Sequence, residues 1–154
     1  MDLKSKIILI SGPTASGKSK LALKIAKKIN GEIINADSMQ VYKELKILTA
    51  RPSEIDLKKI EHHLYGFRSV KKEFSSGEWL QLANKNIKKI RDKNKIPVLV
   101  GGTGLYFKAL TDGLVKIPKI PIHIRNRIRR MQNNLLIAIY NNQNQRTYVG
   151  VKLK

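Results

Sequence analysis

Eight consecutive residues near the N-terminus have the types and spacing of a phosphate-binding loop. Two glycines, a lysine and a serine occupy the required positions in Gly12-Pro13-Thr14-Ala15-Ser16-Gly17-Lys18-Ser19. Glycine lets backbone N–H groups turn inward around phosphate oxygens, and a helix beginning at Lys18 directs its positive end at them. The Lys18 ammonium adds a mobile charge, and the Ser19 hydroxyl is suited to ligate Mg²⁺. We therefore predict that all eight residues form a phosphate site.

A carboxylate and a hydroxyl follow two further apolar segments. Asp37 comes directly after Ile33-Ile34-Asn35-Ala36, and Thr103 comes shortly after Ile96-Pro97-Val98-Leu99-Val100. The carboxyl ends of parallel strands meet at one edge of a sheet, so we expect both residues to border the same crevice as the phosphate loop. Asp37 has a second interpretation, as a residue that only caps the following turn.

The phosphate loop alone leaves the reaction open. Nucleotide hydrolases usually have a further apolar strand that ends in Asp or Glu and organises Mg²⁺ and water. The best candidate strand here ends in Leu99-Val100-Gly101, without a carboxylate, which disfavours ATP hydrolysis. An ATP-dependent small-molecule kinase stays compatible with the pattern, because some of these enzymes also lack the acid.

The adjacent pair His62 and His63 suggests a metal site. Side chains of adjacent residues diverge on a helix or a strand, and we find no third ligand at a fitting spacing. We therefore expect packing or hydrogen bonding from these histidines.

Strands and helices alternate along the part of the chain that carries these groups. Apolar runs predict strands over residues 6–10, 33–36 and 96–100, and helical spacing predicts helices over 18–29, 76–94 and 105–110. We expect the first helix to bury Leu21, Ile25 and Ile29, and the second to bury Trp79, Ala83, Ile87 and Ile90. Ser53, with Asp56 three residues later, predicts the start of a short helix. The expected fold is an α/β, P-loop NTPase-like parallel sheet with flanking helices.

The pattern changes after Gly113. Pro118 and Pro121 bracket a linker, and a basic helix follows with Ile124, Ile128, Met131 and Leu135 along one stripe. The polar segment 141–145 is typical of disorder. We predict a P-loop α/β core over 1–115, the start of a helical insertion over 116–140, and a divergent tail over 141–154.

Composition restricts the class of protein without identifying it. The 154 residues include 31 Lys and Arg against 11 Asp and Glu, a net charge of +20. This excess favours polyanions such as nucleic acid, although a genome biased toward Lys, Ile and Asn codons gives the same composition. Cysteine is absent, which excludes disulfides and thiolate metal sites. We see neither a long apolar span nor a secretory signal, so we expect a cytoplasmic protein without a membrane partner.

Five motifs in register resemble the tRNA dimethylallyltransferase family, also called tRNA isopentenyltransferases or IPP transferases. The phosphate loop is followed in order by Asp37-Ser38-Met39-Gln40-Val41-Tyr42, Thr49-Ala50-Arg51-Pro52, His62-His63-Leu64 and Gly101-Gly102-Thr103-Gly104-Leu105-Tyr106. The resemblance covers residues 5 to about 130. Arg51 stands where the family usually has Lys, and Glu61 replaces a frequent proline.

The resemblance implies transfer of a dimethylallyl group from dimethylallyl diphosphate to the exocyclic amine of an anticodon-loop adenosine in tRNA. It assigns the diphosphate to the phosphate loop, with Mg²⁺ at Ser19, and it makes Asp37 and Thr103 catalytic. It also implies tRNA contacts from Asp37, Ser38, Met39, Gln40, Thr103 and Arg125. An aromatic amine is a weak nucleophile, so a positioned carboxylate aids its attack on the allylic carbon.

The resemblance fades past Arg130. Gln145-Arg146 stands where the family has a tRNA-contacting pair, but Gln143 and Val149 replace an acid and an arginine there. Family members are about twice as long, so we expect a truncated chain with an incomplete sheet, whose activity is left open. The alternatives are the P-loop kinase and a non-catalytic remnant that binds diphosphate or RNA.

Overall fold

The computed structural model describes residues 6–115 and 120–130 of the 154-residue chain. The chain divides into two units, Met1–Leu114 and Val115–Lys154, and each is described by itself. The predicted domain boundaries stay predictions. Among the described residues, no helix combines the length and the apolar character needed to cross a membrane.

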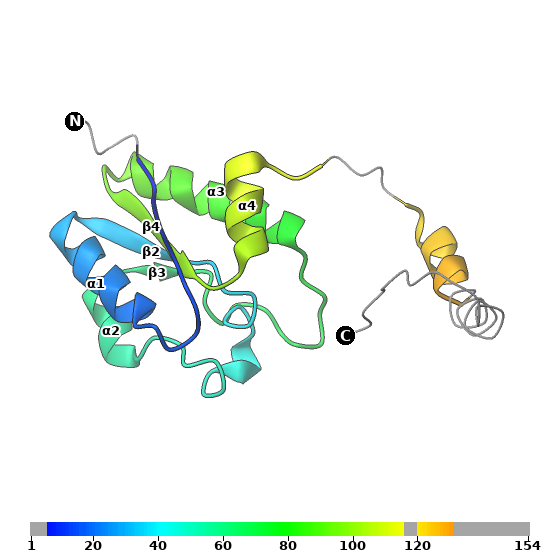
Figure 1. Ribbon diagram of the computed structural model, residues 1–154, viewed down its shortest axis with the longest axis horizontal. Helices are drawn as coiled ribbons and strands as arrows, with labels where there is room; N and C mark the ends of the chain where they lie inside the picture. Colours follow the sequence, from blue (N-terminus) through cyan, green and yellow to red (C-terminus); the bar gives the residue numbers. More distant parts are fainter. Residues whose placement is uncertain (1–5, 116–119, 131–154) are drawn as a thin grey trace, which may run out of the picture. The chain divides into compact units, whose positions relative to one another are not determined.

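A four-stranded parallel sheet forms the centre of the first unit (Figure 1). Its strands, in spatial order, are β1 (Ile8–Ser11), β4 (Ile96–Gly101), β2 (Gly31–Asn35) and β3 (His62–His63). Strands β2 and β4 are buried along their whole length, which explains the continuous apolar run of β4. Strand β2 is equally buried but carries two polar residues, Glu32 and Asn35, whose side chains are hydrogen-bonded. The predicted α/β class and parallel sheet are thereby confirmed.

Helices cover both faces of this sheet (Figure 1). Helix α1 (Lys18–Lys28) packs on one face, while α3 (Ser76–Asp92) and α4 (Gly104–Asp112) pack on the other. Paired residues show the alternation: Ile33 and Val98 face α1, whereas Ile34 and Leu99 face α3 and α4. Alternate residues of the central strands therefore pack against opposite helical layers.

Helix α3 is anchored to the sheet by Trp79. Its ring is fully buried and stacks on Tyr106 of α4, with ring centroids 4.2 Å apart. The indole N–H donates to the carbonyl of Asn35 at the end of β2, at 2.9 Å. At the start of α3, Ser75 and Glu78 form a capping box. The predicted buried face of Trp79, Ala83, Ile87 and Ile90 is confirmed.

The predicted face of α1 needs a correction. Leu21 is half exposed, and the residues buried against the sheet are Ala22 and Ala26. Alanine lets the helix backbone approach the strands closely, so the small residues take the central row. Ile25 and Ile29 pack beside this row, as expected.

Two short elements complete the first unit. Helix α2 (Glu54–Lys59) begins at Ser53, whose hydroxyl accepts the N–H of Asp56 at 3.2 Å as predicted. The 3-10 helix η1 (Lys43–Leu45) and strand β3 were not predicted from sequence. They are too short for a periodic pattern to reveal them.

The described part of the second unit contains a helix over residues 122–130. Ile124 and Ile128 lie on it and are 40% and 53% exposed. The other two members of the predicted stripe, Met131 and Leu135, lie outside the described residues, as does the segment 141–145.

Candidate functional site

The predicted phosphate loop connects β1 to α1. Gly17 precedes the helix with φ of 81°, a left-handed conformation that suits glycine. No side chain caps α1 and its first turn has no acidic residue, so its leading N–H groups are open to an anion. The Lys18 ammonium donates to the carbonyl of Pro13 across the loop. The local geometry is that of an anion cradle.

Asp37 follows β2, and the buried side-chain amide of Asn35 hydrogen-bonds its backbone. The side-chain oxygen of Asn35 accepts the N–H of Asp37 at 2.9 Å, and its NH₂ group donates to the carbonyls of Asp37 and Leu64 at 2.9 and 3.0 Å. Asn35 is fully buried, so these bonds are shielded from water. The position of Asp37 is set by the core.

The Asp37 carboxylate also caps the following turn. Its Oδ1 accepts the N–H of Met39 at 2.9 Å, so the capping interpretation is correct for this oxygen. Within the described residues, Oδ2 has no hydrogen bond. One oxygen fixes the carboxylate, and the other is available for chemistry.

Thr103 connects the end of β4 to the same turn. Its hydroxyl accepts the N–H of Ser38 at 2.9 Å and donates to the Ser38 hydroxyl at 3.2 Å. These bonds join the segments after β2 and β4, which are separated by 65 residues. In this structure Thr103 acts on the turn that carries Asp37.

Glycines allow the two strand ends to approach. A Cβ at Gly101 would lie 2.1 Å from the carbonyl carbon of Ala36 and 2.7 Å from the Asp37 nitrogen. A Cβ at the next residue, Gly102, would lie 3.5 Å from the Gly12 carbonyl oxygen and 4.0 Å from Asp37 Oδ2. The Gly101-Gly102 pair thus brings the phosphate loop and Asp37 to one place.

A cavity of about 560 Å³ lies where these segments meet. It falls in the size range of small-molecule sites. Five phosphate-loop residues line it, namely Thr14, Ala15, Gly17, Lys18 and Ser19. Asp37, Met39 and Gln40 line it as well. The predicted juxtaposition of the phosphate loop with Asp37 is present.

Other predicted site residues lie elsewhere. Among the lining residues we do not find Gly12, Pro13, Ser16, Ser38 or Thr103. Ser38 and Thr103 stand behind Asp37 through the hydrogen bonds described above. Arg125 belongs to the second unit, where it lies on helix 122–130.

Several lining residues had no predicted role. Lys20, in the first turn of α1, continues the wall formed by the phosphate loop, and a second wall comes from Leu48, Thr49, Ala50 and Tyr65. Burial raises the pKa of the Tyr65 hydroxyl, and the nearby Asp37 carboxylate raises it further. Sequence motifs gave the only hint of this wall: Thr49 and Ala50 lie in Thr49-Ala50-Arg51-Pro52, and Tyr65 follows His62-His63-Leu64. The motifs do not show that these segments meet at the cavity.

The donor set of the cavity suits magnesium. Mg²⁺ prefers hard oxygen ligands and keeps several waters, so it needs few groups from the protein. The Ser19 hydroxyl and the Asp37 carboxylate both line the cavity, and both offer such oxygens. The residues present are therefore compatible with the expected ion.

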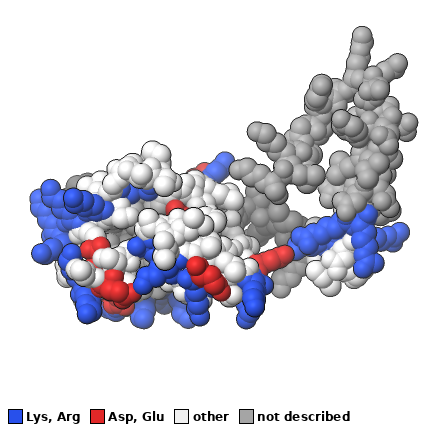
Figure 2. Space-filling view, turned by 90° about the horizontal axis from the view of Figure 1, so that it is seen from below, with Lys and Arg blue, Asp and Glu red and all other residues white. Residues whose placement is uncertain are grey.

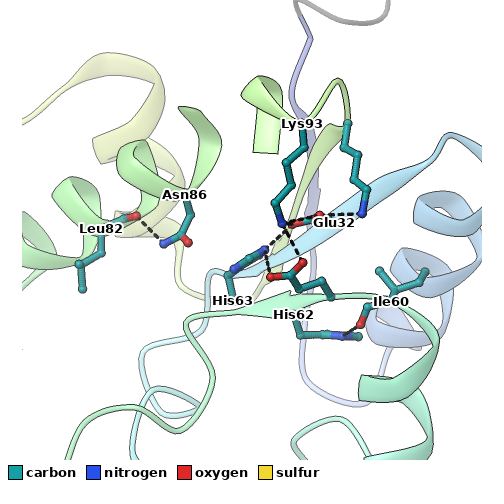
Figure 3. Close-up of polar contacts among 9 residues, drawn as sticks. Glu32, Ile60, His62, His63, Leu82, Asn86 and Lys93 are labelled. Carbon is teal, nitrogen blue, oxygen red and sulfur yellow. Dashed lines mark hydrogen bonds and ion pairs between the residues drawn. The ribbon is translucent and has the colours of Figure 1, made fainter. Parts of the chain in front are cut away.

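A second polar cluster joins β2, β3 and the end of α3 (Figure 3). His63 Nε2 lies 2.7 Å from the fully buried Glu32 carboxylate, which also accepts from Lys95 at 2.8 Å and from Lys93 at 3.1 Å. Burial alone raises the pKa of Glu32, but hydrogen bonds from Lys95, His63 and Lys93 outweigh it and lower the pKa to about 2. Glu32 is held as a carboxylate.

The same cluster contains one of the two histidines for which the sequence offered no additional metal ligand. Ligand atoms of Glu32, Glu61 and His63 lie within 4.8 Å of one another, a three-residue set that includes His63 but not His62 and that spacing along the chain did not reveal. The Lys93 ammonium already bridges Glu32 and Glu61, the latter at 2.9 Å. His62 bonds the Ile60 carbonyl at 2.7 Å. The expected hydrogen bonding of both histidines is observed.

Basic side chains extend beyond the cavity. The outer surface of α1 carries the exposed residues Lys20, Lys24, Lys27 and Lys28. Figure 2 shows Lys and Arg spread over the lower face of the first unit, with a few acidic residues between them. Attraction for a polyanion is therefore not confined to the cavity.

Comparisons with known proteins agree on one family. A family model described as IPP transferase matches residues 40–147, more than half of the chain. The tRNA dimethylallyltransferase of Pelagibacter ubique is 67% identical over 131 residues, which cover 85% of this chain and 42% of that relative. The tRNA dimethylallyltransferase of Parvibaculum lavamentivorans is 52% identical over 124 residues, which cover 80% and 40%.

Solved structures give the same result. The tRNA isopentenylpyrophosphate transferase of Bacillus halodurans superposes with a TM-score of 0.70 at 35% identity, covering 84% of this chain and 43% of that one. A eukaryotic dimethylallyltransferase acting on tRNA gives a TM-score of 0.69 at 31% identity, covering 90% and 32%. The chain spans about two fifths of the length of the curated relatives it matches.

Proposed function

Because this chain belongs to the IPP transferase family, we propose that it transfers a dimethylallyl group from dimethylallyl diphosphate to the exocyclic amine of an anticodon-loop adenosine in tRNA. One observation carries the proposal. A single cavity is lined both by the phosphate loop and by Asp37, so a diphosphate and a carboxylate base lie within reach of one substrate.

The diphosphate binds the loop between β1 and α1. Backbone N–H groups at the start of α1 and the Lys18 ammonium face the phosphate oxygens, and Lys18 exchanges its bond to the Pro13 carbonyl for one to the ligand. These donors stabilise the negative charge of the diphosphate oxygens. The stabilisation is greatest when the diphosphate becomes a leaving group and its negative charge increases.

Magnesium belongs to the proposal as the expected ion. Ser19 would hold it at the phosphate loop, next to Asp37 in the same cavity. When bound, the ion supplies positive charge that favours departure of pyrophosphate.

Asp37 supplies the base. The adenine exocyclic nitrogen forms a bond to the allylic carbon, the bond from that carbon to the diphosphate oxygen breaks, and pyrophosphate departs with the electron pair. One amine proton passes to Asp37 Oδ2, the carboxylate oxygen that caps no turn. The buried Asn35 amide fixes the Asp37 backbone, and the Met39 N–H holds the other carboxylate oxygen.

The tRNA is held by the turn after β2 and by the second unit. Asp37, Met39 and Gln40 border the cavity that the target adenine must reach, and Ser38 and Thr103 fix the shape of that turn. Arg125 on helix 122–130 provides a phosphate contact. The spread of basic charge adds attraction that does not depend on RNA sequence.

Calorimetric titration of the chain with pyrophosphate and with dimethylallyl diphosphate, both in the presence of Mg²⁺, tests the proposal. We expect both ligands to bind, and Lys18→Ala to weaken both. The exposed Lys24→Ala, on the outer side of α1, is the matched control and should have no effect. Tight ATP binding with phosphate transfer to a small alcohol would instead favour the kinase alternative. Binding without any prenylation of undermodified tRNA would favour the non-catalytic remnant.

A further inference from the structure

The cavity has a cationic side and a side that exposes apolar groups. The phosphate loop and the first turn of α1 provide the first, with Lys18, Ser19 and Lys20. The turn after β2 and the segment that precedes α2 provide the second, where Met39, Leu48 and Ala50 lie beside the polar Asp37, Gln40 and Thr49. An inorganic anion can bind the lysines and the hydroxyl of the first side, but it has no apolar surface to contact the apolar side chains of the second. The cavity therefore suits a ligand with one charged end and one apolar end.

Leu48 and Met39 expose apolar surface at this cavity. Leu48 is 80% exposed and Met39 is 49% exposed, and neither belongs to the two core clusters of the described residues. Isolated exposed leucines are ordinary, but here two large apolar side chains border the same cavity. A bound apolar group would remove their surface from water.

Hydrogen bonds hold the segment that carries Leu48. The Gln40 side chain donates to the Thr49 carbonyl at 2.9 Å, and the Thr49 hydroxyl donates to the Leu45 carbonyl at 2.6 Å. Arg51 donates to the Lys43 carbonyl at 2.9 Å. Leu48 therefore lies in a loop that is held by hydrogen bonds, one of which comes from Gln40 in the turn after β2.

We infer that Leu48, together with Met39, contacts the alkyl group of the allylic diphosphate. Only one ester bond separates the alkyl group from the diphosphate, so the alkyl group must lie within the same cavity as the phosphate loop. This contact makes Leu48 a specificity residue that favours the alkyl diphosphate over inorganic pyrophosphate, the product. The inference rests on the proposed function. It adds which residues form the apolar wall of the cavity, namely Met39, Leu48 and Ala50.

Titration of three proteins with two ligands tests this assignment. The proteins are the unchanged chain, Leu48→Ser and Ile47→Ser, and the ligands are dimethylallyl diphosphate and pyrophosphate, each with Mg²⁺. Ile47 is the matched control, because it is the neighbouring residue, is 95% exposed and does not line the cavity. Leu48→Ser should weaken dimethylallyl diphosphate binding by about fivefold and leave pyrophosphate binding unchanged. Ile47→Ser should change neither.

Each other result has a defined meaning. If Leu48→Ser leaves the ratio of the two affinities unchanged while pyrophosphate still binds in a Lys18-dependent way, the inference is wrong and the proposed function stands. If Leu48→Ser weakens tRNA binding and spares dimethylallyl diphosphate, Leu48 is an RNA contact and the inference is again wrong. If neither diphosphate binds the unchanged chain, the proposed function fails, and the inference fails with it.

Discussion

The buried side chain of Asn35 holds the backbone of Asp37 from both sides, because its oxygen accepts the Asp37 N–H and its NH₂ group donates to the Asp37 carbonyl. The same NH₂ group reaches the carbonyl of Leu64, beyond β3. A core residue thereby sets the position of the proposed base and joins it to a distant segment.

Asn35→Ala is expected to reduce the free energy of unfolding by roughly 2–4 kcal/mol, because it leaves one N–H and two carbonyl groups without their buried partner. Urea denaturation measures this loss. Asn84→Ala, at an exposed position of α3, should stay within about 0.5 kcal/mol of the unchanged protein. Equal effects of the two substitutions would contradict the role of the Asn35 amide.

Gly101→Ala should destabilise the protein by roughly 3 kcal/mol or more, because its Cβ would overlap the backbone of Ala36 and neither strand end can yield. We also expect it to lose pyrophosphate binding. Gly104→Ala is the control, since nothing lies within 4 Å of a Cβ there. Thermal melting and pyrophosphate titration measure both effects, and a stable Gly101→Ala variant with intact binding would refute the close approach.

Glu32→Gln should lower the free energy of unfolding by roughly 2–4 kcal/mol at pH 7, because two lysines lose their buried partner. The folded-state pKa of Glu32 is lowered from 4.5 to about 2, so its contribution is complete above pH 4.5 and is lost as the pH falls toward 2. Denaturation curves of the two proteins should converge over that window. Exposed Glu73→Gln should show no such convergence.

Asp37→Asn keeps the size of the side chain and an oxygen that can accept the Met39 N–H. We therefore expect diphosphate binding to survive, while prenyl transfer falls by roughly 10²–10⁴-fold through loss of the base. Labelled dimethylallyl diphosphate with undermodified tRNA measures the transfer. Unchanged turnover would leave Asp37 with its turn-capping role alone.

Arg125→Ala should weaken tRNA binding more than Lys88→Ala, although each substitution removes one exposed positive charge. A lost phosphate contact should reduce the slope of log affinity against log salt by about one, whereas a distant charge should leave it nearly unchanged. Filter binding at several salt concentrations measures both slopes. Similar behaviour of the two variants would mean that Arg125 acts only through the general field of a basic protein.

The sequence by itself determined the family, the α/β class and the local chemistry of the loop. A phosphate loop is contiguous, so its glycines, Lys18 and Ser19 could be identified without any tertiary contact. Strand β4 and helix α3 were predictable because a long apolar run and a periodic apolar pattern reflect which residues are buried. The short apolar pair Ile33-Ile34 was the signal for β2. Five motifs in order identified the family, which the family model confirms.

Only the tertiary structure decided which side chains meet. The Asn35 amide reaches Leu64, and Glu32 pairs with His63 across β2 and β3, although 29 and 31 residues separate the partners. Strand β3 has two residues and no pattern of its own, so its pairing with β2 depends on the rest of the sheet. The apolar wall with Leu48 likewise follows from chain packing. Local sequence encodes the elements, whereas contacts between distant segments depend on how those elements pack.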